Sequence, residues 1–113
     1  MAGSPAKYRV LLTAGAERDL EALYDHVAHS DGLTRAHQLL DRLMEVVESL
    51  ASFPERGSHP KELVALGIKE YRQVLFKSYR VIYRVTGRQV IIYLMVDGRR
   101  DMQSVLARRL LGA

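Results

Sequence analysis

Apolar and polar side chains alternate with a period of two along residues 71–76 and 79–85. Such alternation places successive side chains on opposite faces of a β-strand, so one face of each segment can be buried. Residues 90–96 are apolar almost without interruption, which is typical of a strand covered on both faces or lying at the centre of a sheet. The pattern therefore predicts three consecutive strands.

Short polar turns connect these segments. Lys77 and Ser78 separate the first two strands, and the second turn contains Gly87, which can adopt the positive φ of a tight hairpin. Because turns this short join antiparallel neighbours, the three strands are predicted to form a meander. A charged turn at residues 97–101 ends it.

Two amphipathic helices are predicted before the strands. Residues 14–29 and 33–52 carry apolar side chains at the i, i+3, i+4, i+7 spacing of a helix with one buried face. Thr13 is placed to cap the first helix, and Pro54 ends the second because the residue before a proline disfavours the helical conformation. The short connection between the two helices predicts an antiparallel hairpin.

The remaining segments complete the fold prediction. Residues 8–12 are a strand candidate, residues 61–67 a helical turn, and residues 102–111 a short amphipathic helix. The order β-α-α-β-β-β-α predicts an α+β domain in which the helical hairpin packs on one face of a mainly antiparallel, four-stranded sheet. A chain of 113 residues is expected to form a single domain, residues 1–113, with residues 1–6 flexible.

Composition narrows the functional classes. Hydrophobic residues make up 48% of the chain, which suits a folded domain and is too high for a disordered one. The absence of cysteine excludes disulfides and thiolate metal sites and fits a reducing compartment. There is no apolar run long enough to span a membrane and no secretory pattern at residues 1–6, so a cytoplasmic location is expected. The formal net charge of +4 is a mild indication of an acidic partner.

Five short motifs occur in order along the predicted elements. They are AxxDL at residues 16–20, LxxxP at 50–54, EYRQ at 70–73, YRVIYRV at 79–85 and GRRD at 98–101. No single motif is specific, but the ordered set resembles the ParE/RelE superfamily of toxins from type II toxin–antitoxin pairs. The resemblance extends over nearly the whole chain.

The superfamily contains two functional classes that make different chemical demands. RelE-like toxins are ribosome-dependent ribonucleases in which a 2′-hydroxyl attacks the adjacent phosphate, a reaction that needs a proton acceptor, a proton donor and cations. ParE-like toxins resemble them in fold but poison DNA gyrase without that catalytic set. The two classes therefore differ in the residues they need near the end of the chain.

The sequence matches the ribonuclease pattern only in part. Arg80 matches the strand arginine, and Arg99 or Arg100 matches the arginine after the last strand. The strand expected to carry two lysines has Arg72, Gln73 and Leu75 in that region. Residues 101–113 contain no tyrosine or histidine, where RelE-like enzymes place a catalytic tyrosine. The missing acid/base favours the ParE class and predicts no catalytic residues.

Five arginines are the candidate residues for binding the target or the antitoxin. They are Arg72, Arg80, Arg84, Arg99 and Arg100. Arg80 and Arg84 share a strand face by parity, which favours one basic patch that contacts an acidic antitoxin segment, gyrase or nucleic acid. The competing interpretation is solvated strand arginines, some paired with Glu70 or Asp101. The sequence leaves both interpretations open.

Histidine and tyrosine give weaker signals. The histidines are His26, His29, His37 and His59. His26 and His29 have the i, i+3 spacing of helical metal ligands, but no third ligand stands out, so exposed helix residues are predicted. His59 is a candidate acid/base only for the ribonuclease alternative. Packing among valine and isoleucine, rather than base stacking, is predicted for Tyr79, Tyr83 and Tyr93.

The resemblance implies a toxin that inhibits DNA gyrase and blocks replication, as in plasmid-stability systems. It also implies a ParD-like antitoxin with a ribbon–helix–helix N-terminal part, whose C-terminal segment folds on the toxin in a hetero-oligomer. An apolar groove between the helical hairpin and the sheet is the expected docking place. The alternatives are a RelE-like ribosome-dependent mRNA endoribonuclease and an inactive homologue that binds an antitoxin and represses transcription. No cofactor and no metal are expected.

Overall fold

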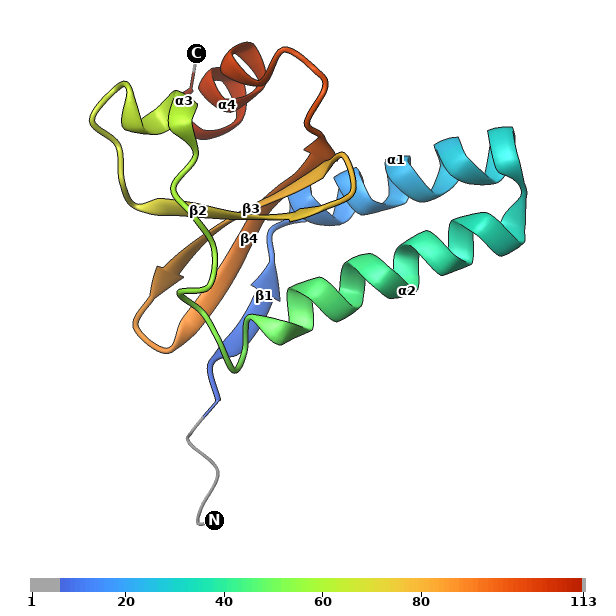
Figure 1. Ribbon diagram of the computed structural model, residues 1–113, viewed down its shortest axis with the longest axis horizontal. Coiled ribbons are helices and arrows are strands. Elements are labelled where there is room, and N and C mark those ends of the chain that lie inside the picture. The colour runs from blue at the N-terminus through green and yellow to red at the C-terminus, as the bar shows by residue number, and fades with distance from the viewer. Residues whose placement is uncertain (1–6, 113) are drawn as a thin grey trace.

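The computed structural model of the protein describes residues 7–112, so the expected flexibility of residues 1–6 lies outside the described residues. The elements follow the predicted α+β order (Figure 1). They are β1 (Arg9–Leu12), α1 (Ala14–Asp31), α2 (Leu33–Ser49), α3 (Lys61–Val64), β2 (Tyr71–Phe76), β3 (Tyr79–Thr86), β4 (Gln89–Asp97) and α4 (Met102–Leu110). Within residues 7–112, no helix is both long and apolar enough to cross a membrane.

The sheet contains four strands in the order β1-β4-β3-β2. β2, β3 and β4 pair antiparallel as the predicted meander, and β1 pairs parallel to the other side of β4. β4 therefore lies inside the sheet with a strand on each side, which agrees with its nearly unbroken apolar sequence. The mainly antiparallel, four-stranded sheet is confirmed.

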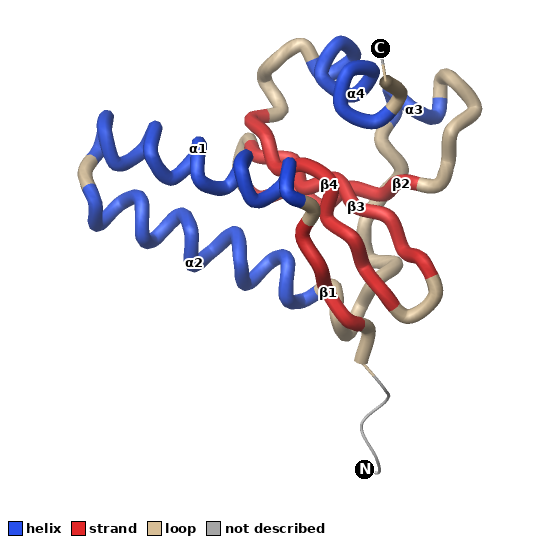
Figure 2. Tube along the Cα trace, turned by 180° about the vertical axis from the view of Figure 1, so that it is seen from behind, coloured by secondary structure: helices blue, strands red, loops and turns tan. Residues whose placement is uncertain are grey.

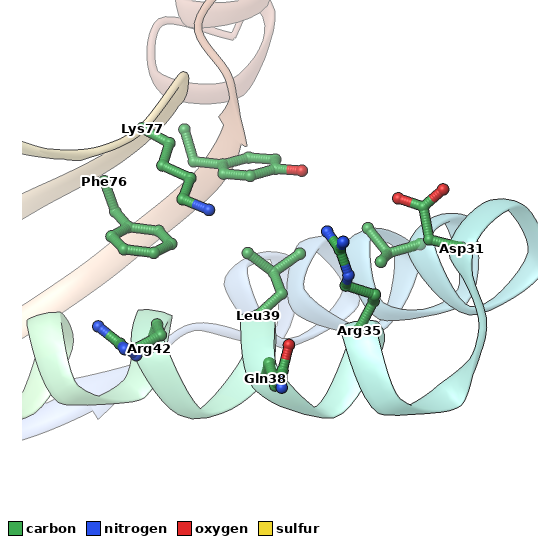
Figure 3. A pocket seen from close by; sticks show the side chains of 9 residues that line it. Asp31, Arg35, Gln38, Leu39, Arg42, Phe76 and Lys77 are labelled. Carbon is green, nitrogen blue, oxygen red and sulfur yellow. The ribbon is translucent and has the colours of Figure 1, made fainter.

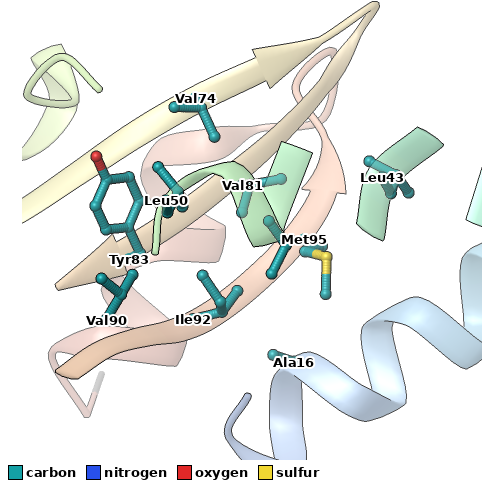
Figure 4. Close-up of a cluster of buried hydrophobic side chains, with 10 residues drawn as sticks. Ala16, Leu43, Leu50, Val74, Val81, Tyr83, Val90, Ile92 and Met95 are labelled. Atoms are coloured by element: carbon teal, nitrogen blue, oxygen red, sulfur yellow. The ribbon is translucent and has the colours of Figure 1, made fainter. Parts of the chain in front are cut away.

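α1 and α2 form the predicted helical hairpin, which covers one face of the sheet and continues past its edge (Figure 1, Figure 2). The Thr13 hydroxyl accepts a hydrogen bond from the Ala16 amide at 3.1 Å and caps α1 as predicted. α2 ends at Ser49 rather than at residue 52, because the backbone tightens into i→i+3 hydrogen bonds over the next residues. The core between hairpin and sheet (Figure 4) contains Ala16, Leu43, Val47, Leu50, Val74, Val81, Tyr83, Val90, Ile92 and Met95.

A second core lies on the opposite face of the sheet, where α3 and α4 pack. The side chains buried there are Leu63, Tyr71, Ile82, Leu94, Val96, Met102, Val105 and Leu106. The sequence prediction included both short helices but assigned neither of them to a face of the sheet, so this layer was not predicted. The sheet is therefore the middle of three layers, and β3 and β4 are covered on both faces.

A β-bulge redirects the side chains in the second half of β4. The pairing register of β3 and β4 skips Tyr93, which is the extra residue on the bulged strand. As a result Ile92 and Met95 both face the helical hairpin, although strict alternation would place them on opposite faces.

Polar side chains from α1 and α4 satisfy the backbone beside this bulge. The Asp19 carboxylate accepts a hydrogen bond from the Met95 amide at 3.0 Å and two from the Arg109 guanidinium, each at 2.9 Å. The Thr13 hydroxyl and Arg109 both donate to the Tyr93 carbonyl at 3.3 Å. The aspartate of the AxxDL motif thus ties α1, β4 and α4 together, which is a structural reason for that motif.

Candidate functional site

Arg80 lies on the face of β3 that packs under α3, and its side chain is almost completely buried. Its Nη1 and Nη2 donate to the two carboxylate oxygens of Glu62 on α3, both at 2.9 Å, and its Nε donates to Gln73 Oε1 at 2.7 Å. These charge-assisted hydrogen bonds hold the pKa of Glu62 at about 2, below its ordinary value of 4.5. We call this group, Arg80 with Glu62 and Gln73, the Arg80 site.

The aliphatic stem of Arg80 is enclosed as well. A Cβ added at Gly98 would lie 2.6 Å from Arg80 Cδ, so glycine is the residue that leaves room for the arginine stem. The glycine of the GRRD motif is thus explained by packing. Because the guanidinium fork already holds a carboxylate, a phosphate could bind there only by displacing Glu62 from a nearly buried pair.

The structure does not bring the five predicted arginines into one patch. Arg84 shares the strand face of Arg80 and is half-buried opposite Tyr71 of β2. Arg72 lies on the other face, where its Nη1 donates to the Gly57 carbonyl at 2.8 Å and anchors the loop before α3. The reason is parity, because residues 72 and 80 occupy opposite faces of the paired strands.

Arg99 and Arg100 are exposed in the turn between β4 and α4. Arg99 pairs with Asp97, with Nη2 and Oδ2 2.6 Å apart, and this pairing lowers the pKa of Asp97 to about 2. The alternative partner predicted from sequence, Asp101, instead caps α4 by accepting hydrogen bonds from the amide and hydroxyl of Ser104. The acidic partners of the arginines are therefore Glu62 and Asp97.

The histidines lie outside the Arg80 site. His37 of α2 and Tyr24 of α1 share a hydrogen bond of 3.1 Å between Nε2 and the hydroxyl. His59 Nδ1 lies 3.1 Å from the Tyr71 carbonyl, which can only accept, so this nitrogen carries the proton. His59 also lies beside Arg72 in a cleft of about 280 Å³, nearer to an arginine than its sequence position indicated. Among residues 7–112, no group of three or more His, Asp or Glu side chains could hold a metal.

The three strand tyrosines pack as predicted. Tyr83 is fully buried, and its hydroxyl donates to the Pro54 carbonyl at 2.8 Å and accepts from the Gly57 amide at 3.0 Å. Tyr79 packs against the core under the hairpin, and Tyr93 against the core under α4. The tyrosines therefore serve the fold.

A groove lies between the helical hairpin and the β2–β3 turn, where the sequence predicted a docking place. Its volume is about 420 Å³. Figure 3 shows Phe76 and Lys77 on one side and Arg35, Leu39 and Arg42 of α2 on the other. The full lining comprises Val27, Asp31, Arg35, Gln38, Leu39, Arg42, Phe76, Lys77 and Tyr79. The lining of the groove thus combines apolar and charged side chains on both of its sides.

The charged residues of the lining are mainly cationic. Arg35, Arg42 and Lys77 form no ion pair within the described residues, and Asp31 supplies the one carboxylate of the lining. The sequence analysis did not identify these cations as site residues. The pattern assigned Arg35 and Arg42 to the polar face of a helix and Lys77 to a turn. The signal was present: Arg35, Gln38, Leu39 and Arg42 have the i, i+3, i+4, i+7 spacing that places them on one side of α2.

Comparisons with known proteins agree with the fold and the motifs. The family model described as the ParE toxin of the type II toxin–antitoxin system parDE matches residues 10–102. Toxin ParE3 of Caulobacter vibrioides is 28% identical over 101 residues, which cover 89% of this chain and 97% of the relative.

Two solved structures share the fold. One is the chromosomal ParDE system of P. aeruginosa, with a TM-score of 0.69 and 20% identity over 82% of this chain and 98% of the other. The second is the toxin–antitoxin complex RelBE2 of Mycobacterium tuberculosis, with a TM-score of 0.61 and 20% identity over 83% and 94%. The family model covers most of the chain, from β1 to the start of α4. This protein therefore belongs to the ParE family of type II toxin–antitoxin toxins.

Proposed function

We propose that this toxin binds DNA gyrase and inhibits it, and that it breaks no bond itself. The proposal extends family membership to the activity that the sequence resemblance implied. The observation that carries it is the occupied Arg80 site, in which Glu62 holds the guanidinium fork that the ribonuclease pattern would use for phosphate. Because gyrase acts on DNA in the bacterial cytoplasm, the toxin is proposed to act there and to block replication.

The chemistry of RNA cleavage supports the same choice. A cleaving site needs an accessible cation beside groups that accept and donate a proton. Arg80 is paired with Glu62, and Arg72 is turned to the opposite face of the sheet. Residues 101–113 contain no tyrosine and no histidine. Binding is therefore the function that these residues support best.

The proposed antitoxin is ParD-like, with a ribbon–helix–helix part and a C-terminal segment that folds on the toxin. The groove beside α2 supports this docking, because its apolar side chains can bury anchoring residues and its cations can attract acidic ones. Arg99 and Arg100 are exposed in the turn between β4 and α4, and we propose them as contacts for gyrase. Arg72, Arg80 and Arg84 are proposed to support these surfaces through the fold.

Two assays with the purified toxin test the proposal. The first measures supercoiling of relaxed plasmid by gyrase, and the second measures cleavage of a message bound to ribosomes. Loss of supercoiling with an intact message is expected. Cleaved message with normal supercoiling would overturn the proposal in favour of the endoribonuclease.

A matched pair of variants locates the gyrase contact. The double variant Arg99→Ala, Arg100→Ala is expected to weaken gyrase inhibition. The control Arg18→Ala removes one charge from an exposed position on α1 and is expected to have no effect. Equal inhibition by all three proteins would remove Arg99 and Arg100 from the proposed contact. Neutralisation of each variant by the antitoxin shows that the fold is retained.

A further inference from the structure

Lys77 has a backbone conformation that lysine rarely adopts. Its φ of 54° lies in the left-handed region, where the Cβ crowds the following carbonyl and where glycine or asparagine is the usual residue. It is the non-glycine residue with positive φ among residues 7–112. The tight two-residue turn between β2 and β3 requires such a conformation, but it does not require a lysine.

The side chain of Lys77 does little for the fold. It forms no ion pair and no hydrogen bond within the described residues, and its one contact of this kind is a cation–π contact, with Nζ 5.6 Å from the centre of the Phe76 ring. Figure 3 shows this side chain beside Phe76 on one wall of the groove, with Arg35 and Arg42 on the α2 wall. The strained position therefore presents an ammonium group to the groove.

The charges of the groove favour an acidic occupant. The lining contains three cations, Arg35, Arg42 and Lys77, and one carboxylate, Asp31, together with the apolar side chains of Leu39 and Phe76. A segment with apolar anchors and spaced carboxylates complements both properties. Strain kept at an exposed position whose side chain gains only a cation–π contact is a reason to look for a function.

We infer that Lys77 is a specificity-determining residue of the groove, whose ammonium group pairs with a carboxylate of the bound antitoxin segment. The inference rests on the proposed docking of an antitoxin segment in this groove. Arg35 and Arg42 on α2 attract the acidic segment as a whole. Lys77, on the opposite wall, pairs with the side chain at one position of the segment. A partner with a neutral side chain at that position loses the pairing, which discriminates between antitoxins.

Three substitutions at one position separate charge from backbone conformation. Lys77→Gly removes both the charge and the strain, Lys77→Asn removes the charge and keeps a residue tolerant of positive φ, and Lys77→Arg keeps the charge. The matched control is Lys69→Asn, because Lys69 is an exposed lysine outside the groove.

The probe is the labelled C-terminal segment of the protein encoded by the adjacent reading frame, together with a peptide in which its Asp and Glu are replaced by the amides. We expect Lys77→Gly and Lys77→Asn to weaken binding of the acidic peptide about fivefold at low salt, the size of a well-formed exposed pair. Lys77→Arg and Lys69→Asn should bind as the unmodified toxin does. The difference should shrink as salt is raised, and the amide peptide should not distinguish the variants.

Two other binding results would each contradict one step of this proposal. If Lys77→Gly and Lys77→Asn bind normally while the double variant Arg35→Glu, Arg42→Glu loses binding, the role of Lys77 is refuted and groove docking stands. If the double variant also binds normally, docking in this groove is refuted. The melting temperature of Lys77→Gly should be equal to or above that of the unmodified toxin, and a clear fall would assign Lys77 to the fold instead.

Discussion

Replacing Glu62 by glutamine tests the Arg80 site directly. The substitution keeps the size of the side chain and removes the charge that holds the Arg80 guanidinium. The side chains of Arg80 and Glu62 are only 10% and 15% exposed, so water compensates little for the lost carboxylate. We expect the variant to fold but to be substantially less stable.

The magnitude follows from the pKa of Glu62. A fall from 4.5 to about 2 corresponds to about 3 kcal/mol of interaction with the charged carboxylate. Breaking a fully buried pair costs about 3–5 kcal/mol, and an exposed pair contributes about 1 kcal/mol or less, so about 2–3 kcal/mol is expected here. That loss lowers the melting temperature by roughly 10 °C in a chain of this size.

The pH dependence provides an independent check. Because the folded pKa of Glu62 lies below its unfolded value, the contribution is complete above about pH 4.5 and is lost as the pH falls toward 2. Urea unfolding at a series of pH values should therefore show a difference between the unmodified toxin and Glu62→Gln that is constant near neutrality and shrinks in acid. Glu48→Gln, on the exposed face of α2, is the control and should show little difference at any pH.

Two results would refute this reasoning. One is a stability difference below about 0.5 kcal/mol at neutral pH, the range of ordinary surface substitutions. The other is a difference that does not change between neutral pH and pH 3, because the lost interaction would then not depend on the charge of Glu62. The double variant Arg80→Met, Glu62→Met should recover much of the loss, since a well-packed apolar pair can replace a buried ion pair.

Further predictions concern the packing that positions these surfaces. Tyr83→Phe leaves the buried Gly57 amide without its acceptor, so we expect a loss of about 1–3 kcal/mol in urea unfolding and faster hydrogen exchange at Gly57; unchanged exchange would contradict the role of the hydroxyl. Asp19→Ala removes the acceptor of the Met95 amide, which should exchange faster while the α2 amides keep their protection; equal acceleration everywhere would indicate global destabilisation instead. Leu43→Ala creates a cavity at a fully buried position and should cost about 2–5 kcal/mol by thermal or urea unfolding.

The elements predicted correctly are those with local signals. The hairpin helices have a long 3.6-residue period, and the first two meander strands have a period of two and short turns. The bulge at Tyr93 was not predicted, because both faces of β4 are buried and its side chains are apolar on both. A shift in register therefore moves no polar residue into a core and leaves no signal in the sequence. The layer of α3 and α4 was not predicted because a short apolar stripe indicates a buried helix face but does not show which face of the sheet it covers.

The candidate sites were predictable only in part for a related reason. Parity correctly placed Arg80 and Arg84 on one face, but it could not show that Glu62, 18 residues earlier on a one-turn helix, holds Arg80. The groove was predicted between hairpin and sheet, whereas its cations were not, because Lys77 and Arg42 become neighbours only when the β2–β3 turn folds over α2. Contacts between distant segments carry no periodic signal in the sequence.

The place of β4 in the sheet has a consequence during synthesis of the chain. β1 emerges from the ribosome first, yet its pairing partner is β4, the last strand to be made. Asp19 likewise binds Arg109, which is synthesised 90 positions later. Folding of the sheet is therefore delayed until nearly the whole message has been translated, and a ribosome that stops before β4 releases a fragment that cannot complete the sheet.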